Sequence, residues 1–409
     1  MASPLWRLAA ALFAMLPLAG RSGEASGTPP LTARIMPTVQ YAHADIYYRT
    51  PPGEGPSFTL TRELVADQRL DLLVMAQGAS SDAAGKMNVV YDLRVLAPDG
   101  SVVEDSRDLR LAVDRAVPAQ ITPARMVLFP TDVAALVVKP GEPMGEYRIE
   151  VTVRDRVAGT TATATQTVTA SADNAPLPWP ESKDVNLWWT TYYLNPQPRL
   201  FVSALVELSR KPELRNRPPE GQGALLGFTD QVLKDNPWLV PQVLAQVKRT
   251  DDEWEKRILS MVLASALRDR PGELENLLKD VVKRLPQESK EPLAGAQLDL
   301  WWGQFLGGGR FQPVLELVQL VERYQVYRPA YDAYAARPEP RGAATLDERR
   351  GALHATALWS LGSNARQHKR VMHYLVGLRQ APGTDAATKA VVDAALADPP
   401  PARAGARTR

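Results

Sequence analysis

The stretch LDLWWGQFLGGG, Leu298 to Gly309, carries two adjacent tryptophans and ends in three glycines. VNLWWTTYYLNP, Val185 to Pro196, places the same leucine and tryptophan pair before another break. Neighbouring residues on a helix point about 100° apart, so the two rings of a pair do not readily share one flat surface. The pairs therefore predict core packing at the seams between helices rather than a ligand platform.

Amphipathic segments and short breaks alternate from residue 184 to residue 397. Apolar residues recur at helical spacing in GELENLLKDVVKRL, FQPVLELVQLVERY and RLFVSALVEL, which begin at Gly272, Phe311 and Arg199. The expected breaks are NPQP, DNP, DRPG, GGG and GSN, beginning at Asn195, Asp235, Asp269, Gly307 and Gly362. Leu358 and Trp359 before the GSN break repeat the layout of the tryptophan pairs more loosely. This order of helix, turn and helix predicts an α-solenoid of helical hairpins.

The segment from residue 31 to residue 172 has a period of two instead. Alternating runs flank Asp99-Gly100 in YDLRVLAPDGSVVEDSRDLRLAV, and a second pair turns at Gly159 in GEYRIEVTVRDRVAGTTATATQTVTA. One face of the latter collects Tyr147, Ile149, Val151 and Val153. Short strands without a helical pattern between them predict an antiparallel β-sandwich.

The chain is therefore expected to be a multidomain β + α protein. Between Gly20 and Pro178 there is no tryptophan, whereas eight occur from Trp179 onward. The predicted parts are a signal peptide (1–25), a β-sandwich (31–172), a linker (173–183), an α-helical hairpin repeat domain (184–397) and a disordered tail (398–409).

The N-terminal residues read as an export signal. Arg7 precedes the apolar run LAAALFAMLPLAG, which is shorter than the roughly 20 residues that span a bilayer. Cleavage would leave a mature form without a transmembrane segment, periplasmic or at the cell surface; the alternative is an uncleaved anchor. The chain has no cysteine, so disulfides are excluded, and its formal charge of +2 gives no support for nucleic-acid binding.

Two segments resemble known families. GEYRIEVTVRD, which begins at Gly145, resembles the late strands of bacterial immunoglobulin-like modules. The tryptophan in a first helix with a glycine near the following turn resembles tetratricopeptide-like helical hairpins. These resemblances imply a β-sandwich followed by stacked helical repeats.

The candidate site is a tyrosine-rich segment, RYQVYRPAYDAYAARP, which begins at Arg323. Pro329 is expected to break or restart its helix. Tyrosine and arginine are enriched in interaction hot spots, so we predict a partner-binding surface here. The alternative is that two of the tyrosines lie inward. The predicted partner-binding residues are Tyr324, Tyr327, Arg328, Tyr331 and Tyr334.

Chemistry at a metal or catalytic site is not expected. His368 and His373 are five residues apart, unlike the spacing of a two-histidine metal site, and His43 reads as an ordinary surface or edge residue. Asp251-Asp252 is expected to cap a helix. No P-loop, nucleophile elbow or zinc-protease motif occurs, so neither a cofactor nor a catalytic residue is predicted.

The leading hypothesis is a non-catalytic exported adaptor or scaffold that binds envelope proteins through its helical surface. A glycan-binding module is the alternative, for which exposed coplanar tryptophans would be the discriminating feature. An envelope enzyme is a third possibility, and a deep pocket with carboxylates of raised pKa would argue for it.

Overall fold

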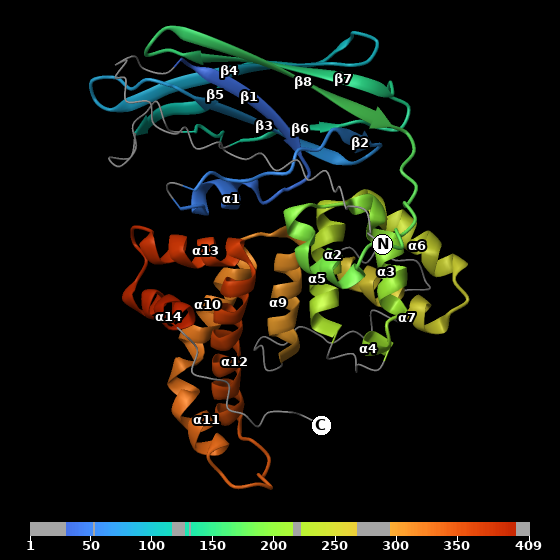
Figure 1. The fold of residues 1–409 in the computed structure, drawn as a ribbon, viewed down its shortest axis with the longest axis vertical. Helices are drawn as coiled ribbons and strands as arrows, with labels where there is room; N and C mark the ends of the chain where they lie inside the picture. Colours follow the sequence, from blue (N-terminus) through green and yellow to red (C-terminus); the bar gives the residue numbers. More distant parts are fainter. Residues whose placement is uncertain are drawn as a thin grey trace, which may run out of the picture.

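The structure is a computed structural model that describes residues 30–51, 54–116, 127–130, 132–215, 222–267 and 295–397. Three predictions lie outside the described residues: the signal peptide at 1–25, the tail at 398–409, and the DRPG break with the amphipathic helix at 272–285. Strands fill the first half of the described chain and helices the second, and Figure 1 shows them as two layers.

The strand-rich half forms two sheets. One has the strand order β1-β3-β6 and the other β2-β8-β7-β4-β5. The pairs are antiparallel except β2 with β8, which is parallel and departs from the all-antiparallel prediction. The strands are β1 (Thr32–Thr38), β2 (Glu63–Val65), β3 (Arg69–Gln77), β4 (Lys86–Leu96), β5 (Val102–Ala116), β6 (Ala134–Val137), β7 (Gly145–Asp155) and β8 (Thr160–Ser171).

The predicted period-two pattern is confirmed in β7, and both predicted turns are present. The first pair departs from the pattern, because β4 is buried along most of its length and β5 is exposed along much of its length. All four predicted inward residues of β7 are buried, because successive side chains of a strand alternate between faces. Gly100 and Gly159 take positive φ angles of 83° and 66° in the turns after β4 and β7. Leu72 of β3 and Tyr91 of β4 belong to one buried cluster, so the two sheets share a core.

A helix that the sequence analysis missed, α1 (His43–Arg49), interrupts the strand-rich half. It lies between the sheets and the helical half (Figure 1). Its Tyr47 ring stacks on Phe129, with centroids 4.8 Å apart. The helix has only 7 residues, about two turns, and a single buried residue, Ile46, so it has little apolar periodicity by which to recognise it.

The helical half contains short, closely spaced elements. Its α-helices are α2 (Val185–Thr191), α3 (Phe201–Ser209), α4 (Pro212–Arg215), α5 (Gly223–Asp235), α6 (Val240–Arg249), α7 (Glu253–Ala266), α9 (Gly295–Gly308), α10 (Gln312–Tyr324), α11 (Arg328–Ala335), α12 (Leu346–Gln367), α13 (Lys369–Gln380) and α14 (Ala386–Leu396). Within the described residues, the 3-10 turns between them are η2 (Tyr192–Leu194), η3 (Pro198–Leu200), η5 (Pro237–Leu239) and η7 (Gln325–Tyr327).

Several local predictions for these helices are confirmed. The apolar stripes of α3 and α10 are buried. Asp252 is the N-cap of α7 and accepts hydrogen bonds from the backbone N–H groups of Trp254 and Glu255. Pro329 lies in the first turn of α11. Proline is tolerated there because the backbone N–H groups of the first turn have no acceptor within the helix, so the missing N–H of proline breaks no hydrogen bond.

Glycines allow helices α5 and α9 to pack with their backbones close together. A methyl group on Gly227 of α5 would lie 2.0 Å from the carbonyl oxygen of Leu300, and one on Gly303 of α9 would lie 2.0 Å from that of Ala224. Both positions therefore require glycine for the two backbones to approach so closely. Gly307 extends the contact one turn further, since a methyl group there would lie 2.6 Å from the Phe228 carbonyl oxygen.

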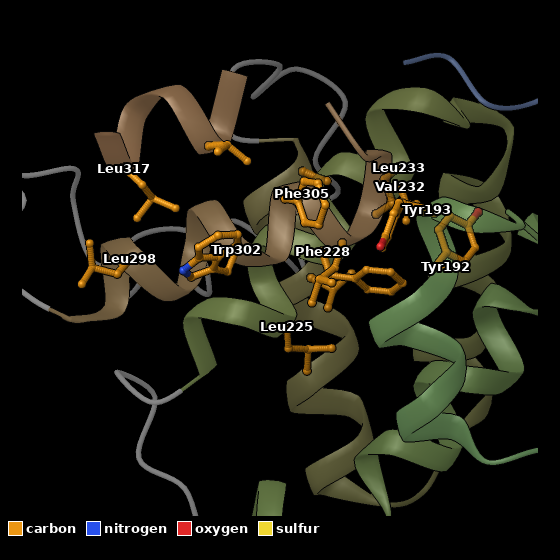
Figure 2. Close-up of a cluster of buried hydrophobic side chains, with 14 of the residues drawn as sticks. Tyr192, Tyr193, Leu225, Phe228, Val232, Leu233, Leu298, Trp302, Phe305 and Leu317 are labelled. Carbon is orange, nitrogen blue, oxygen red and sulfur yellow. The ribbon is translucent and has the colours of Figure 1, made fainter. Parts of the chain in front are cut away.

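Core packing was predicted for the tryptophan pairs, and one ring of each pair is buried. Trp188 and Trp302 are buried, whereas Trp189 and Trp301 are half-buried against the same core. Figure 2 shows Trp302 beside Phe305, and its indole N–H donates to the Ser360 hydroxyl at 3.1 Å. The buried ring is the first of one pair and the second of the other, so the two segments do not pack as equivalent repeats.

The helices do not stack in the sequential order of helical hairpins. The extensive α5–α9 contact joins elements separated by α6 and α7, and α10 packs on both α12 and α14. The predicted helix break at GSN, which begins at Gly362, is wrong, because α12 continues through these residues. Gly362 instead lets α14 pack closely on α12, since a methyl group on it would lie 2.5 Å from the Ala395 carbonyl oxygen. A helical C-terminal half is present, but tetratricopeptide-like repeats are not confirmed.

The α1 region joins the two halves. The Asp45 carboxylate accepts a hydrogen bond from the backbone N–H of Phe311 at 2.9 Å, at the beginning of α10. The Arg49 guanidinium lies 3.4 Å from the centre of the Phe311 ring. The Gln40 amide donates to the carbonyl oxygen of Tyr193 at 3.0 Å, and Glu54 pairs with Lys369 at 2.5 Å. These contacts fix the helical half against the strands.

Candidate partner-binding surface

The tyrosine-rich segment belongs to an arm, which we define as residues 325–356: η7, α11, the connecting loop and the first half of α12. Figure 1 shows α11 and this part of α12 extending away from the other helices. The two helices pack on each other along the arm. The arm therefore offers two helices with few neighbours to cover their outer faces.

Close packing at Gly351 and a capping box hold the arm in shape. A methyl group on Gly351 would lie 2.3 Å from the Tyr327 carbonyl oxygen and 2.7 Å from Cβ of Tyr331, so glycine lets α11 rest on α12. Thr345 and Glu348 form the capping box at the start of α12. Arg337 pairs with Glu348 from the end of α11.

One predicted binding residue does not lie on the surface. Tyr324 ends α10 and is 4% exposed, in the same core as the tryptophans. The prediction of an accessible Tyr324 is therefore wrong. Tyr324 is the last residue of α10 and continues the buried stripe of that helix before the chain turns at η7. Tyr327 is half-buried and lies under the Arg350 guanidinium, 5.1 Å from the ring centre.

The three remaining predicted residues are partly accessible and lie together on α11. Arg328 pairs with Asp332 at 2.8 Å, one turn along the helix. Tyr331 and Tyr334 are half-buried, and the Tyr334 hydroxyl donates to the Gly342 carbonyl oxygen at 3.2 Å.

Two arginines add cationic groups to the end of the arm. The guanidinium groups of Arg337 and Arg341 lie 5.2 Å and 5.9 Å from the Tyr334 ring centre. These cation–π contacts add to the ion pairs of Arg337 with Glu348 and of Arg341 with Glu339 in ordering the two side chains. The arm thus presents guanidinium and phenol groups that are held in place before any partner arrives.

Two large apolar residues, one in η7 and one in α12, are exposed, contrary to or beyond what the sequence analysis predicted. Val326 of η7 is 72% exposed and Trp359 of α12 is 59% exposed. Trp359 was expected to pack as the tryptophan pairs do. It instead falls on the outer face of α12, where a helical wheel of the segment would have placed it opposite Leu353, Ala357 and Leu361, all of which are buried.

Histidines serve structural contacts in the part of the chain that the structure describes. His43, expected at the surface, lies 2.9 Å from the fully buried Asp71 carboxylate. His354 bonds to the Val321 carbonyl oxygen and His368 to the Tyr193 hydroxyl. Within the described residues, no group of three or more histidine, cysteine or acidic side chains could hold a metal ion.

Shifted carboxyl groups have structural causes in the strand-rich half. Arg154 and the backbone N–H of Asp108 hold the pKa of Asp92 well below its usual range. Arg154 lies 2.5 Å from the Asp92 carboxylate and 2.7 Å from that of Asp108, linking β4, β5 and β7. A different case is Asp235 of α5, whose pKa is raised by burial. It lines a pocket that is described below.

No helix among the described ranges combines the length and apolar character needed to cross a membrane.

Comparisons with known proteins give little further information. No protein-family model and no curated protein matches the chain. The chain is similar to the CARDB domain of a Pyrococcus furiosus protein in complex with di-metal ions, with 13% identity, 35% of this chain and 90% of that chain covered, and a TM-score of 0.19. It is also similar to superoxide reductase (neelaredoxin) from Ignicoccus hospitalis, with 11% identity, coverage of 27% and 75%, and a TM-score of 0.18. For a β-glucuronidase from Bacteroides uniformis, the identity is 12%, the coverage 35% and 14%, and the TM-score 0.20. At these TM-scores the similarities carry no argument about function.

Proposed function

We propose that this protein is a non-catalytic, exported interaction protein that binds a protein partner of the cell envelope through the arm. The observation that carries the proposal is the arm's projection from the helical half with tyrosine and arginine groups already ordered on α11. Tyrosine and arginine dominate binding hot spots because they bury large areas and still form directed polar contacts. Ordering them in advance reduces the entropy lost on binding.

The finer architecture that supports this role is an immunoglobulin-like sandwich carrying a helical scaffold. The shared core of the two sheets favours the sandwich. The contacts of Asp45 and Arg49 with Phe311 supply a rigid connection between the halves. Such a junction would keep a partner bound to the arm at a fixed distance from the strand-rich half.

Export rests on the N-terminal sequence. Arg7 and the following apolar run have the order of a secretory signal, and a chain with no cysteine suits an oxidising compartment. Fractionation of cells followed by N-terminal sequencing of the envelope form would test this. A mature N-terminus near residue 26 is expected, and recovery of the uncleaved chain in the cytoplasm would contradict export.

Affinity capture from solubilised envelope tests the arm. The variant carries Arg328→Ala, Tyr331→Ala and Tyr334→Ala, and leaves Tyr324 intact because that residue is part of the core. Tyr48→Ala is the matched control, since Tyr48 is 50% exposed on α1, far along the chain from the arm. Defined proteins captured by the parent and the control but lost from the variant would support the proposal.

Unchanged circular dichroism must accompany that loss, so that unfolding of the arm is not mistaken for lost binding. Capture that survives in the arm variant would show that the partner binds elsewhere. Absence of any captured protein from all three forms would argue against an adaptor altogether.

A further inference from the structure

A pocket of about 430 Å³ with a mixed polar and apolar lining lies in the helical half, beside the α5–α9 crossing and the start of α10. Its walls include Gln231 and Asp235 of α5, Trp301 and Gln304 of α9, Arg310 of the α9–α10 turn and Glu316 of α10. We call it the Trp301 pocket. The volume falls within the range of roughly 300–1,000 Å³ that is usual for small-molecule sites.

Trp301 supplies the apolar surface of this pocket. Its neighbour Trp302 is buried, whereas Trp301 is half-buried and lines the pocket wall. The α5–α9 contact through Gly227 and Gly303 fixes the helices that carry this ring and the amides of Gln231 and Gln304. The indole and the hydrogen-bonding groups therefore line one pocket on two closely packed helices.

The polar groups are ordered by bonds to two carboxylates. Asp235 accepts hydrogen bonds from the Gln231 amide at 3.0 Å and from the Arg310 guanidinium at 2.5 Å. On the neighbouring turn of α5, Asp230 accepts from Lys234 at 2.9 Å and from Gln304 at 3.4 Å.

These bonds leave hydrogen-bonding capacity for a ligand. Each amide has an oxygen and a second N–H besides the bond described, and Asp235 has further lone pairs. Nε of Arg310 is buried and has no hydrogen-bond partner among the described residues. Burial raises the pKa of Asp235.

The charges of the pocket indicate a neutral ligand. Its cationic groups are Lys234 and Arg310, and its acidic groups are Asp235 and Glu316, so the formal charges cancel. A phosphate or carboxylate site would have an excess of cations, and a cation site an excess of acids. An aromatic face with amide, carboxylate and guanidinium groups around it suits a ring that is apolar on its faces and carries hydroxyls at its edge.

We propose that the Trp301 pocket binds a neutral sugar unit of a glycan. The C–H face of the sugar lies against the indole of Trp301, and its hydroxyls bond to Gln231, Gln304 and Arg310. Aromatic surface contributes affinity through burial, while the planar polar groups select the pattern of hydroxyls. This inference is independent of the arm, which lies at another part of the helical half.

Isothermal titration calorimetry of the whole chain tests the proposal with three probes. Triacetylchitotriose and maltotriose are neutral trisaccharides that differ in their acetamido groups, and trialanine is a zwitterionic peptide of similar size. We expect millimolar or tighter binding of at least one trisaccharide and none of trialanine. Trp301→Ala should weaken that binding by at least about tenfold, whereas Trp359→Ala, which removes an exposed indole outside the pocket, should leave it unchanged within about twofold.

Two further variants protect the test against loss of fold. Gln304→Ala keeps the indole and is expected to weaken binding by about fivefold to tenfold through one lost hydrogen bond. Trp301→Phe should recover part of the affinity that Trp301→Ala loses. Binding of neither trisaccharide at millimolar concentration would overturn the proposal, and so would preferential binding of trialanine or sugar binding that is insensitive to both Trp301→Ala and Gln304→Ala.

Discussion

Replacing Gly227 with alanine tests the closest helix contact in the protein. In an ordinary helix this change stabilises by about 0.5–1 kcal/mol, because alanine restricts the unfolded chain more than glycine does. Here the added methyl group would lie 2.0 Å from the Leu300 carbonyl oxygen, whereas ordinary van der Waals contact is 3.4–4 Å. The helices must separate by more than 1 Å to relieve that overlap, and the opposite contact of Gly303 with Ala224 opens with them.

The expected loss follows from overpacking. Forcing an extra methyl group into a close-packed contact destabilises by about 1–3 kcal/mol, and here the group meets backbone rather than a side chain that could move aside. Gly295→Ala is the control, since Gly295 begins α9, the helix that Gly227 of α5 faces, and has nothing within 4 Å of the added methyl group. Gly227→Ala should therefore be roughly 2–4 kcal/mol less stable than Gly295→Ala.

Urea unfolding followed by far-ultraviolet circular dichroism measures this difference. Because either substitution alone separates the helices, Gly227→Ala and Gly303→Ala together should destabilise by less than the sum of their separate effects. Equal stability of Gly227→Ala and Gly295→Ala would refute the close α5–α9 contact. Strict additivity of Gly227→Ala and Gly303→Ala would show that the two substitutions act at separate places.

Three other changes probe the junction, the sheet and the core. Asp45→Ala should destabilise by about 0.5–2 kcal/mol, because it removes the acceptor for the Phe311 N–H at the start of α10; an unchanged urea midpoint would contradict this. Asp92→Asn should flatten the acid side of the stability profile: the folded pKa of Asp92 is depressed, so its contribution is complete above the ordinary value of 3.8 and declines as pH falls below it. Urea midpoints measured between pH 5 and pH 2 check this, and parallel profiles for both proteins would refute it. Tyr324→Ala should destabilise by about 3–5 kcal/mol as a large core truncation, whereas a loss below about 1 kcal/mol would show that the ring is not buried.

Local periodicity predicted much of the secondary structure. Tyr147, Ile149 and Val151 lie on one buried face of β7 because alternation is a property of the strand itself. The apolar stripe of α10 is equally local, and it even contains Tyr324, which a search for surface aromatics mistook for a binding residue. A tyrosine at a core position of a stripe should be assigned to the core before its neighbours are considered.

Long-range packing decided what the sequence analysis missed. Gly362 suggested a break, but α14 occupies the space that its missing side chain leaves. In the Trp301 pocket, Asp235 pairs with Arg310, although α6, α7 and α9 separate the two residues along the chain. Nothing in the sequence around either residue indicates this ion pair. One clue was present: glycines spaced four apart, at Gly223 and Gly227 and again at Gly303 and Gly307, are typical of helices whose backbones pack closely.

The most direct test of the proposed interaction function is site-specific photo-crosslinking in living cells. A photoreactive phenylalanine replaces Tyr331 on the arm in one strain and Tyr48 on α1 in another, and both are irradiated at the same expression level. We predict a discrete protein adduct from position 331 and none of the same size from position 48. No adduct from position 331, or the same products from both positions, would contradict binding of an envelope protein through the arm.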